Sequence, residues 1–311
     1  MTRIDVHAHV IGDAYRRALT PLSGGGPPLP RAHLEDLLSM MDRHAIDGAV
    51  ISTGPPGAAV GDRGLAVELA HVANEEIADA VRAQPDRLAG LAVLPLADVA
   101  DALDELGRAL DLLELDGVML LSNVGGTYLG DPKWDPLFDE LHRRGAYVFV
   151  HPAAGPYPPP LDWPVWLYEF PFDTTRAIVH MIYSGVLERC PSIRMQVSHL
   201  GGAAPFLAHR LASLAEREPR LAQRAPAGAF VYLRRLWYDT GLSNNHVALA
   251  STLAAVPGNR VVFGTDWPYA ALPASGDPAP DLGLDADARA DVDAVNAAVL
   301  VPRLAARLTA A

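Results

Sequence analysis

Strand-like and helix-like segments alternate along nearly the whole chain, and this alternation limits its fold more than any other feature. Short hydrophobic runs predict strands near 3–9, 48–53, 88–94, 117–121, 146–151, 193–198, 235–239 and 260–264. Apolar residues at three- or four-residue spacing predict helices near 31–45, 64–84, 98–114, 134–144, 173–188, 203–217, 245–255 and 286–308. Eight such pairs predict an α/β protein with the (β/α)8 TIM barrel architecture.

Composition favours one sizeable domain over residues 1–311. The chain has 311 residues, of which 50% are hydrophobic and 20% charged, and no Ser/Gly-rich linker divides it. The formal net charge of −12 disfavours nucleic acid and anionic membranes as partners, because their phosphates would repel such a surface. Cys190 is the single cysteine, and the sequence shows no signal peptide or apolar stretch of membrane-spanning length. We therefore expect a cytoplasmic protein.

The first predicted strand contains two histidines, His7 and His9, with one residue between them. Side chains alternate across a strand, so both imidazoles project from the same face. Their nitrogens are then close enough to share one divalent ion of the type that imidazole prefers. A single His-x-His pair is weak evidence in a chain with 11 histidines, so the prediction depends on further ligands.

Three more polar residues stand just past predicted strands, namely His151, His199 and Asp266. Each alone is equally well explained as a hydrogen-bonded histidine or a helix-capping aspartate. Together with His7 and His9 they match the way a (β/α)8 barrel gathers an active site at the C-terminal ends of its strands. Asp5 shares the orientation of His7 and His9, and we expect it to be a structural group below them rather than a ligand.

Long loops follow three of the predicted strands: residues 23–28 lie after the first, 152–171 after the fifth and 273–285 after the last. Long loops at this rim of a barrel commonly form lids and substrate walls. The second loop is aromatic and could line a pocket or form a dimer contact; its aromatic residues are Tyr157, Trp163, Trp166, Tyr168 and Phe170. Trp166 and Trp267 are candidate substrate contacts. Arg176 could meet a substrate carboxylate or the neighbouring Asp173.

Six stretches, in this order and spacing, carry a family resemblance. They are Asp5-Val6-His7-Ala8-His9, Val150-His151-Pro152, Pro171-Phe172-Asp173-Thr174-Thr175-Arg176-Ala177-Ile178, Ser184-Gly185-Val186-Leu187-Glu188-Arg189, Ser198-His199-Leu200-Gly201-Gly202 and Phe263-Gly264-Thr265-Asp266-Trp267-Pro268. They resemble the amidohydrolase superfamily, in the branch of metal-dependent aromatic-acid decarboxylases that act on aminocarboxymuconate semialdehyde, γ-resorcylate and 6-methylsalicylate.

The resemblance implies a cofactor, a proton carrier and an assembly. One zinc ion, with manganese as the alternative, would be bound by His7, His9, His151 and Asp266. His199 would lie beside the ion and handle protons, with Asp266 as the other catalytic group. The family is commonly dimeric or larger. This chain departs from some relatives at Gly202, where they carry an acidic residue three positions after the histidine.

The predicted metal count is one. Dinuclear members of the superfamily bridge two ions with a carboxylated lysine at a strand end. The only lysine of this chain is Lys133, which stands in a loop and not at the end of a predicted strand.

The same five residues suit two reactions. A hydroxybenzoate-type acid could chelate the ion through its carboxylate and neighbouring hydroxyl, and then lose carbon dioxide after a proton reaches the ring carbon from Asp266 or His199. Alternatively, the ion could activate a water that hydrolyses a lactone, ester or amide. We favour non-oxidative decarboxylation of a small aromatic carboxylic acid, because nothing in the chain marks a lactone or amide pocket. A non-catalytic metal-binding protein would have little reason to keep His199. Of the remaining histidines, His246 follows a strand and merits inspection.

Overall fold

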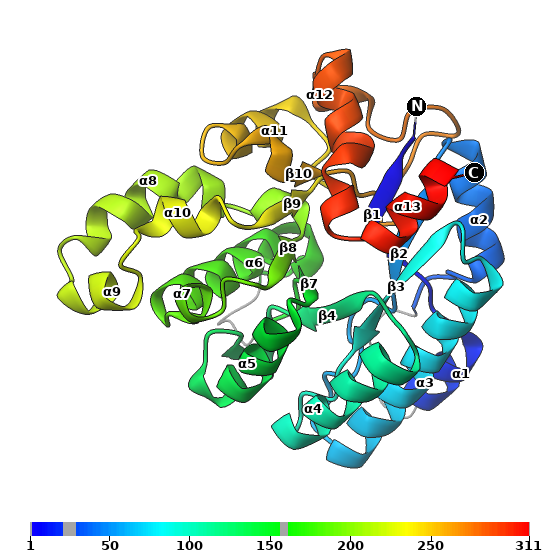
Figure 1. The fold of residues 1–311 in the computed structure, drawn as a ribbon, viewed down its shortest axis with the longest axis horizontal. Helices are drawn as coiled ribbons and strands as arrows, with labels where there is room; N and C mark the ends of the chain where they lie inside the picture. The colour runs from blue at the N-terminus through cyan, green and yellow to red at the C-terminus, as the bar shows by residue number, and fades with distance from the viewer. Residues whose placement is uncertain (1, 21–28, 156–160, 311) are drawn as a thin grey trace.

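The computed structural model describes residues 2–20, 29–155 and 161–310, and its centre is a sheet of eight strands (Figure 1). The strands are β1 (Ile4–His9), β2 (Gly48–Ser52), β3 (Leu88–Val93), β4 (Gly117–Leu121), β7 (Tyr147–His151), β8 (Arg194–Val197), β9 (Trp237–Asp239) and β10 (Val261–Val262). They neighbour one another in this order, and every pairing between them is parallel. All eight fall within the segments predicted from sequence.

The sheet closes on itself between its first and last strands. The amide of Val6 donates to the carbonyl of Phe263 at 2.9 Å, and the amide of Asp266 donates to the carbonyl of His7 at 2.7 Å. Ala8 and Trp267 form a further parallel bridge. The predicted (β/α)8 barrel is therefore confirmed, and its closure brings β1 directly beside the segment that carries Asp266.

Helices surround the strands on the outside (Figure 1). They are α1 (Asp13–Leu19), α2 (Leu34–Arg43), α3 (Arg63–Ala83), α4 (Val99–Gly107), α5 (Asp135–Arg144), α6 (Val165–Tyr183), α7 (Val186–Arg189), α8 (Ala204–Ala215), α9 (Pro219–Arg224), α10 (Ala229–Leu233), α11 (His246–Leu253), α12 (Ala286–Ala290) and α13 (Pro302–Ala310). A short antiparallel hairpin, β5 (Asn123–Val124) with β6 (Thr127–Tyr128), follows β4. No helix in the described part of the chain is both long and apolar enough to cross a membrane.

Alternation along the strands divides the core into two layers. Val148 of β7 belongs to the buried cluster that includes Phe138 of α5 and Ile178 of α6. Its neighbour Phe149 belongs to a second cluster with Met119 of β4 and points to the barrel interior, where its ring meets His7. Val148 and Phe149 thus bury apolar side chains on opposite faces of β7, as expected of a parallel strand between a helix layer and a packed interior.

The helix predicted at 173–188 begins earlier than its pattern indicated. The helix α6 starts at Val165 and contains Pro171, so Trp166, Tyr168 and Phe170 are helical and not part of a loop. A proline inside a helix is unexpected, because proline lacks an N–H and clashes with the preceding turn. The six residues before it nevertheless form helical turns of their own, and Trp166 stands 59% exposed on them.

The segment 273–285 leaves the C-terminal rim instead of covering it. The imidazole Nδ1 of His44, at the end of α2, lies 2.9 Å from the carbonyl oxygen of Gly276. Asp277 lies 3.4 Å from Arg3, which precedes β1 at the opposite end of the barrel. The hydrogen bond to His44 and the ion pair with Arg3 therefore hold residues 273–285 along the outside of the barrel. This segment does not form a lid over the C-terminal rim. The other two long-loop predictions rest partly on residues 23–28 and Tyr157, which lie outside the described residues.

Candidate metal and proton-transfer site

Five side chains from four parts of the barrel meet at the C-terminal ends of the strands. His7 and His9 come from β1, His151 ends β7, His199 follows β8 and Asp266 follows β10. The ring centroids of His7, His9 and His151 are 5.1–5.2 Å apart in every pair. All five residues are buried. The structure thus brings together the five residues predicted from sequence as metal ligands or proton carriers.

Asp266 lies between the imidazoles. Its Oδ1 is 3.2 Å from Nε2 of His7 and 3.1 Å from Nε2 of His9. Its Oδ2 is 3.1 Å from Nε2 of His199. One oxygen of the Asp266 carboxylate therefore faces the histidine pair of β1, and the other faces His199. The carboxylate thus links the candidate metal ligands to the candidate proton carrier.

Each of the three candidate histidine ligands has a partner at Nδ1. The carboxylate of Asp239 is 3.0 Å from Nδ1 of His7, and the hydroxyl of Ser52 is 3.0 Å from Nδ1 of His9. Nδ1 of His151 is 2.8 Å from the carbonyl oxygen of Pro152. Such partners orient a metal-binding imidazole and leave Nε2 as the ligand atom.

The other ring nitrogens fit a divalent ion. Nε2 of His151 is buried and has no hydrogen-bond partner among the described residues, and the buried Nε2 of His7 has only the Asp266 carboxylate, 3.2 Å away, beside it. Candidate ligand atoms of His7, His151, His199 and Asp266 all lie within 4.8 Å of one another. Buried polar atoms are rarely left unsatisfied, so two such nitrogens facing a carboxylate indicate a site for a cation. Imidazole and carboxylate are ligands that zinc and manganese both accept.

The charges within the site shift the pKa values of its members in opposite directions. Burial lowers the pKa of His7, but the carboxylates of Asp239 and Asp266 outweigh it and raise the value to about 10. Burial and the neighbouring His7 hold the pKa of His151 well below its usual value. Burial favours the neutral form of Asp266, yet the imidazoles around it keep its pKa well below normal. Asp266 is therefore an anion, and His7 must give up a proton to bind an ion.

Sequence reasoning missed Asp239, which ends β9 and is fully buried. Its carboxylate accepts from the backbone N–H of His199 at 3.2 Å and from Gln196 Nε2 at 2.7 Å, in addition to its contact with His7. A signal was present, because an aspartate at the end of a predicted strand was the pattern that identified Asp266. Asp239 supports a metal-site histidine and the backbone of His199 at once.

Asp5 lies one layer below the histidines, as expected. It accepts from the amides of His7 and Thr265, each at 3.0 Å, and from the Thr265 hydroxyl at 2.6 Å. Burial raises the pKa of Asp5 to about 6. These contacts join β1 to the segment before Asp266, so the role of Asp5 is to hold the two parts of the site together.

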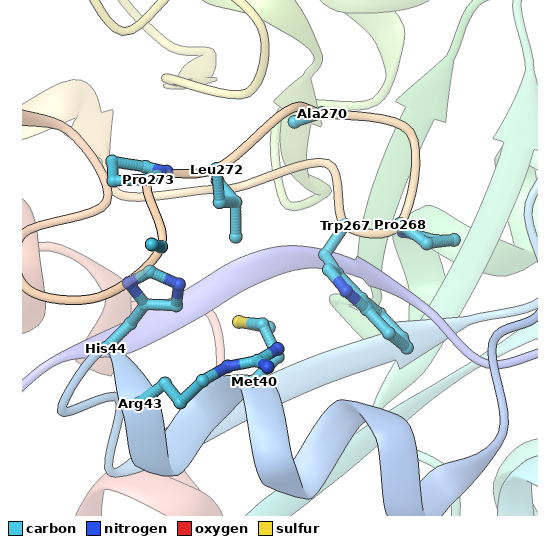
Figure 2. Close-up of a pocket in the computed structure, with 9 residues that line it drawn as sticks. Met40, Arg43, His44, Trp267, Pro268, Ala270, Leu272 and Pro273 are labelled. Atoms are coloured by element: carbon cyan, nitrogen blue, oxygen red, sulfur yellow. The ribbon is translucent and has the colours of Figure 1, made fainter.

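The three predicted substrate contacts are not gathered at the cluster. Trp267 lines a separate pocket of about 250 Å³ with Met40, Arg43 and His44 of the α2 region (Figure 2). Arg176 is paired with Glu169 through Nη1 and Oε2 at 3.3 Å, and Trp166 is exposed on α6. Tyr269 is an aromatic residue that does lie near the cluster: its ring is 5.4 Å from that of His9. Burial and Asp266 raise the pKa of Tyr269 to about 12.

Two further polar residues lie away from the site. His246 is exposed at the start of α11. The ammonium of Lys133 lies 4.0 Å above the ring of Trp134 and belongs to the outer surface.

Comparison with known proteins identifies the family of this chain. A family model described as amidohydrolase matches residues 4–303. The chain is 32% identical over 284 residues to a 6-methylsalicylic acid decarboxylase from Penicillium expansum, a match that covers 87% of this chain and 86% of the relative.

Solved structures share the fold along the whole chain. The crystal structure of amidohydrolase II superposes with a TM-score of 0.86 at 25% identity, covering 97% of this chain and 100% of that one. A dihydroxybenzoic acid decarboxylase from Polaromonas sp. JS666, solved with manganese and the inhibitor 2-nitroresorcinol, superposes with a TM-score of 0.79 at 19% identity, covering 96% of each chain.

Proposed function

The chain belongs to the amidohydrolase family, and from that premise we propose that it is a metal-dependent carboxy-lyase that removes carbon dioxide from a hydroxybenzoate-type acid. The observation that carries the proposal is the position of His199, 3.1 Å from the Asp266 carboxylate and next to the buried Nε2 atoms of His7 and His151. Relatives that decarboxylate 6-methylsalicylate and dihydroxybenzoate support the substrate class. We infer that residues 1–311 act as one catalytic domain.

One divalent ion would be held by His7, His9, His151 and Asp266. Such an ion, when bound, supplies a positive charge that holds the carboxylate and neighbouring hydroxyl of the acid and stabilises the charge of the phenolate. Three imidazoles and one carboxylate suit zinc, and we propose zinc as the ion. The manganese in a structural relative makes that metal the alternative, which elemental analysis of the purified protein distinguishes.

The residues of the chain supply the proton. We propose that His199, whose Nε2 lies 3.1 Å from the Asp266 carboxylate, delivers it to the ring carbon that bears the carboxylate. Asp266 is the alternative donor, and because it is an anion it would first have to accept a proton from that imidazole. The bond from that carbon to the carboxylate then breaks, its electron pair returns to the ring, and neutral carbon dioxide leaves. The aromatic ring of Tyr269 beside His9 offers a contact for the substrate ring.

Isotope labelling tests the reaction. In deuterium oxide, incubation with 6-methylsalicylate or 2,6-dihydroxybenzoate should give a product with one deuteron on the carbon that lost carbon dioxide, because the proton donor exchanges with solvent. Mass spectrometry and NMR of the product measure this. A panel of lactones serves as the comparison: release of an acid that carries oxygen from labelled water, with no carbon dioxide, contradicts the proposal.

We also propose that the protein forms a homodimer or larger assembly. Large apolar side chains are exposed on α6, on the segment before it and on the adjoining α8. They are Leu161, Trp163, Trp166, Leu167, Phe172 and Phe206. Monomers rarely expose so many large apolar residues together, and a second copy would cover them. Sedimentation equilibrium of the wild type and of Trp163→Arg tests this assignment.

A further inference from the structure

The turn that carries His199 has a costly backbone conformation. Residues 199–202 have φ values of 55°, 53°, 74° and 61° in succession. Two of these residues, His199 and Leu200, are not glycine, and each pays for a left-handed conformation. Such a turn persists only where its surroundings hold it at both ends.

The first end of the turn is held from β9 and from the segment after it. The amide of His199 donates to Asp239, and the hydroxyl of Ser243 donates to the His199 carbonyl at 3.4 Å. The contact with Asp239 belongs to the site already described. The two contacts leave the second end, at Gly202 and Ala203, without support from these elements.

The second end rests on α6. The amide of Ala203 donates to the hydroxyl oxygen of Thr175 at 2.9 Å, and that hydroxyl donates to the carbonyl of Pro171 at 2.7 Å. Thr175 is 6% exposed, and the Ala203 amide has no other acceptor among the described residues. A side chain at Gly202 would overlap the Pro171 carbonyl, so helix and turn are in direct contact there.

We propose that Thr175 is a positioning residue, which holds the second end of the His199 turn and so keeps the imidazole in line with Asp266. The proposal rests on the proposed decarboxylase function for its catalytic consequence. The Pro171 carbonyl fills the space beside Gly202, and the Thr175 hydroxyl that donates to it connects that carbonyl to the turn.

The chain contains a matched control in the next residue. Thr174 is fully buried on the same helix, and its hydroxyl has no hydrogen-bond partner among the described residues. Replacing Thr174 by valine therefore removes a buried hydroxyl from the neighbouring residue without removing a contact to the turn. Thr175→Ser and Thr175→Ala form a second matched pair, because both lose the methyl group and only the alanine variant loses the hydroxyl.

The experiment combines hydrogen exchange with kinetics on the metal-loaded protein. Thr175→Ala and Thr175→Val should increase amide exchange in the peptide spanning residues 199–205 and lower kcat about 10–100-fold, because small displacements of a catalytic group have effects of this size. KM and metal content should stay within about threefold of the wild type, since the metal-site histidines are not touched. Thr175→Ser should restore kcat to within about threefold, and Thr174→Val should match the wild type.

Two results would overturn the proposal. In the first, Thr175→Ala and Thr175→Ser show equal amide exchange at residues 199–205. In the second, these two variants have the same kcat. Failure of the proposed function looks different, because the wild type itself would then decarboxylate no hydroxybenzoate. In that case the exchange data alone decide whether Thr175 holds the turn.

Discussion

The two sides of the site are built in different ways. On the side of β1 and β10, His7 and His9 lie within a strand, and backbone hydrogen bonds between His7 and Asp266 and between His9 and Trp267 set their positions. On the side of β8, His199 lies beyond the strand end, on a turn that Asp239, Ser243 and Thr175 hold from three other elements. Strand register thus places the candidate ligands, whereas side-chain contacts place the candidate proton carrier.

This difference predicts distinct effects of mutation on the two sides. Changes on the side of β1 should remove the ion. Changes on the side of β8 should leave the ion bound and slow proton transfer to the substrate. Asp239 contacts both His7 and the backbone of His199, so its replacement should weaken metal binding and also slow proton transfer.

The largest effect is expected from the loss of a metal ligand. Replacing His7, His9, His151 or Asp266 by alanine should abolish metal binding and activity, because each removes one member of a buried cluster. In the metal-free wild type the pKa of His7 is raised to about 10, so an ion must displace its proton. Apparent affinity should therefore fall as pH falls from 10 toward 6. Elemental analysis and chelator competition measure both effects, and two ions per active chain would contradict a mononuclear site.

A smaller effect is expected from the loss of the proton carrier. His199→Ala should lower kcat about 10²–10⁴-fold while one ion stays bound, since a proton carrier, the role proposed for His199, contributes to the transition state and not to ion affinity. Steady-state kinetics and metal analysis of the same preparation check this. His246→Ala, which changes an exposed histidine, is the control. Loss of the ion together with activity would place His199 among the ligands.

The smallest effect is expected at Asp239. Asp239→Asn should weaken metal affinity about 10–100-fold, because the partner of a metal-binding imidazole commonly contributes that much. It should also lower kcat, because the same carboxylate accepts from the His199 amide. Ser52→Ala is the comparison, since it removes only the neutral partner of His9. If the two variants lost equal metal affinity, the charge of Asp239 would have no special role.

The contrast between the two sides also explains what could be predicted from sequence. A period of two identifies which side chains share a strand face, so the convergence of His7, His9, His151 and Asp266 followed from their positions at strand ends. The support of His199 did not follow, because it depends on left-handed backbone and on Thr175 reaching across from a helix. The position of the Trp267 side chain could not be predicted from sequence either. Its neighbour Asp266 faces the candidate metal ligands, yet the Trp267 indole lies in the pocket beside α2 (Figure 2).

Closure of the barrel between its first and last strands has a consequence for the order of synthesis. His9 and Asp266 are 257 residues apart in the chain but 3.1 Å apart in the fold. At about 5–20 residues per second, the two histidines of β1 leave the ribosome tens of seconds before their carboxylate partner is made. The nascent chain therefore has no complete cation site while its early βα units form. An ion held by all four candidate ligands would be fully bound only after the last strand has joined the first, and its binding would then stabilise the closed barrel.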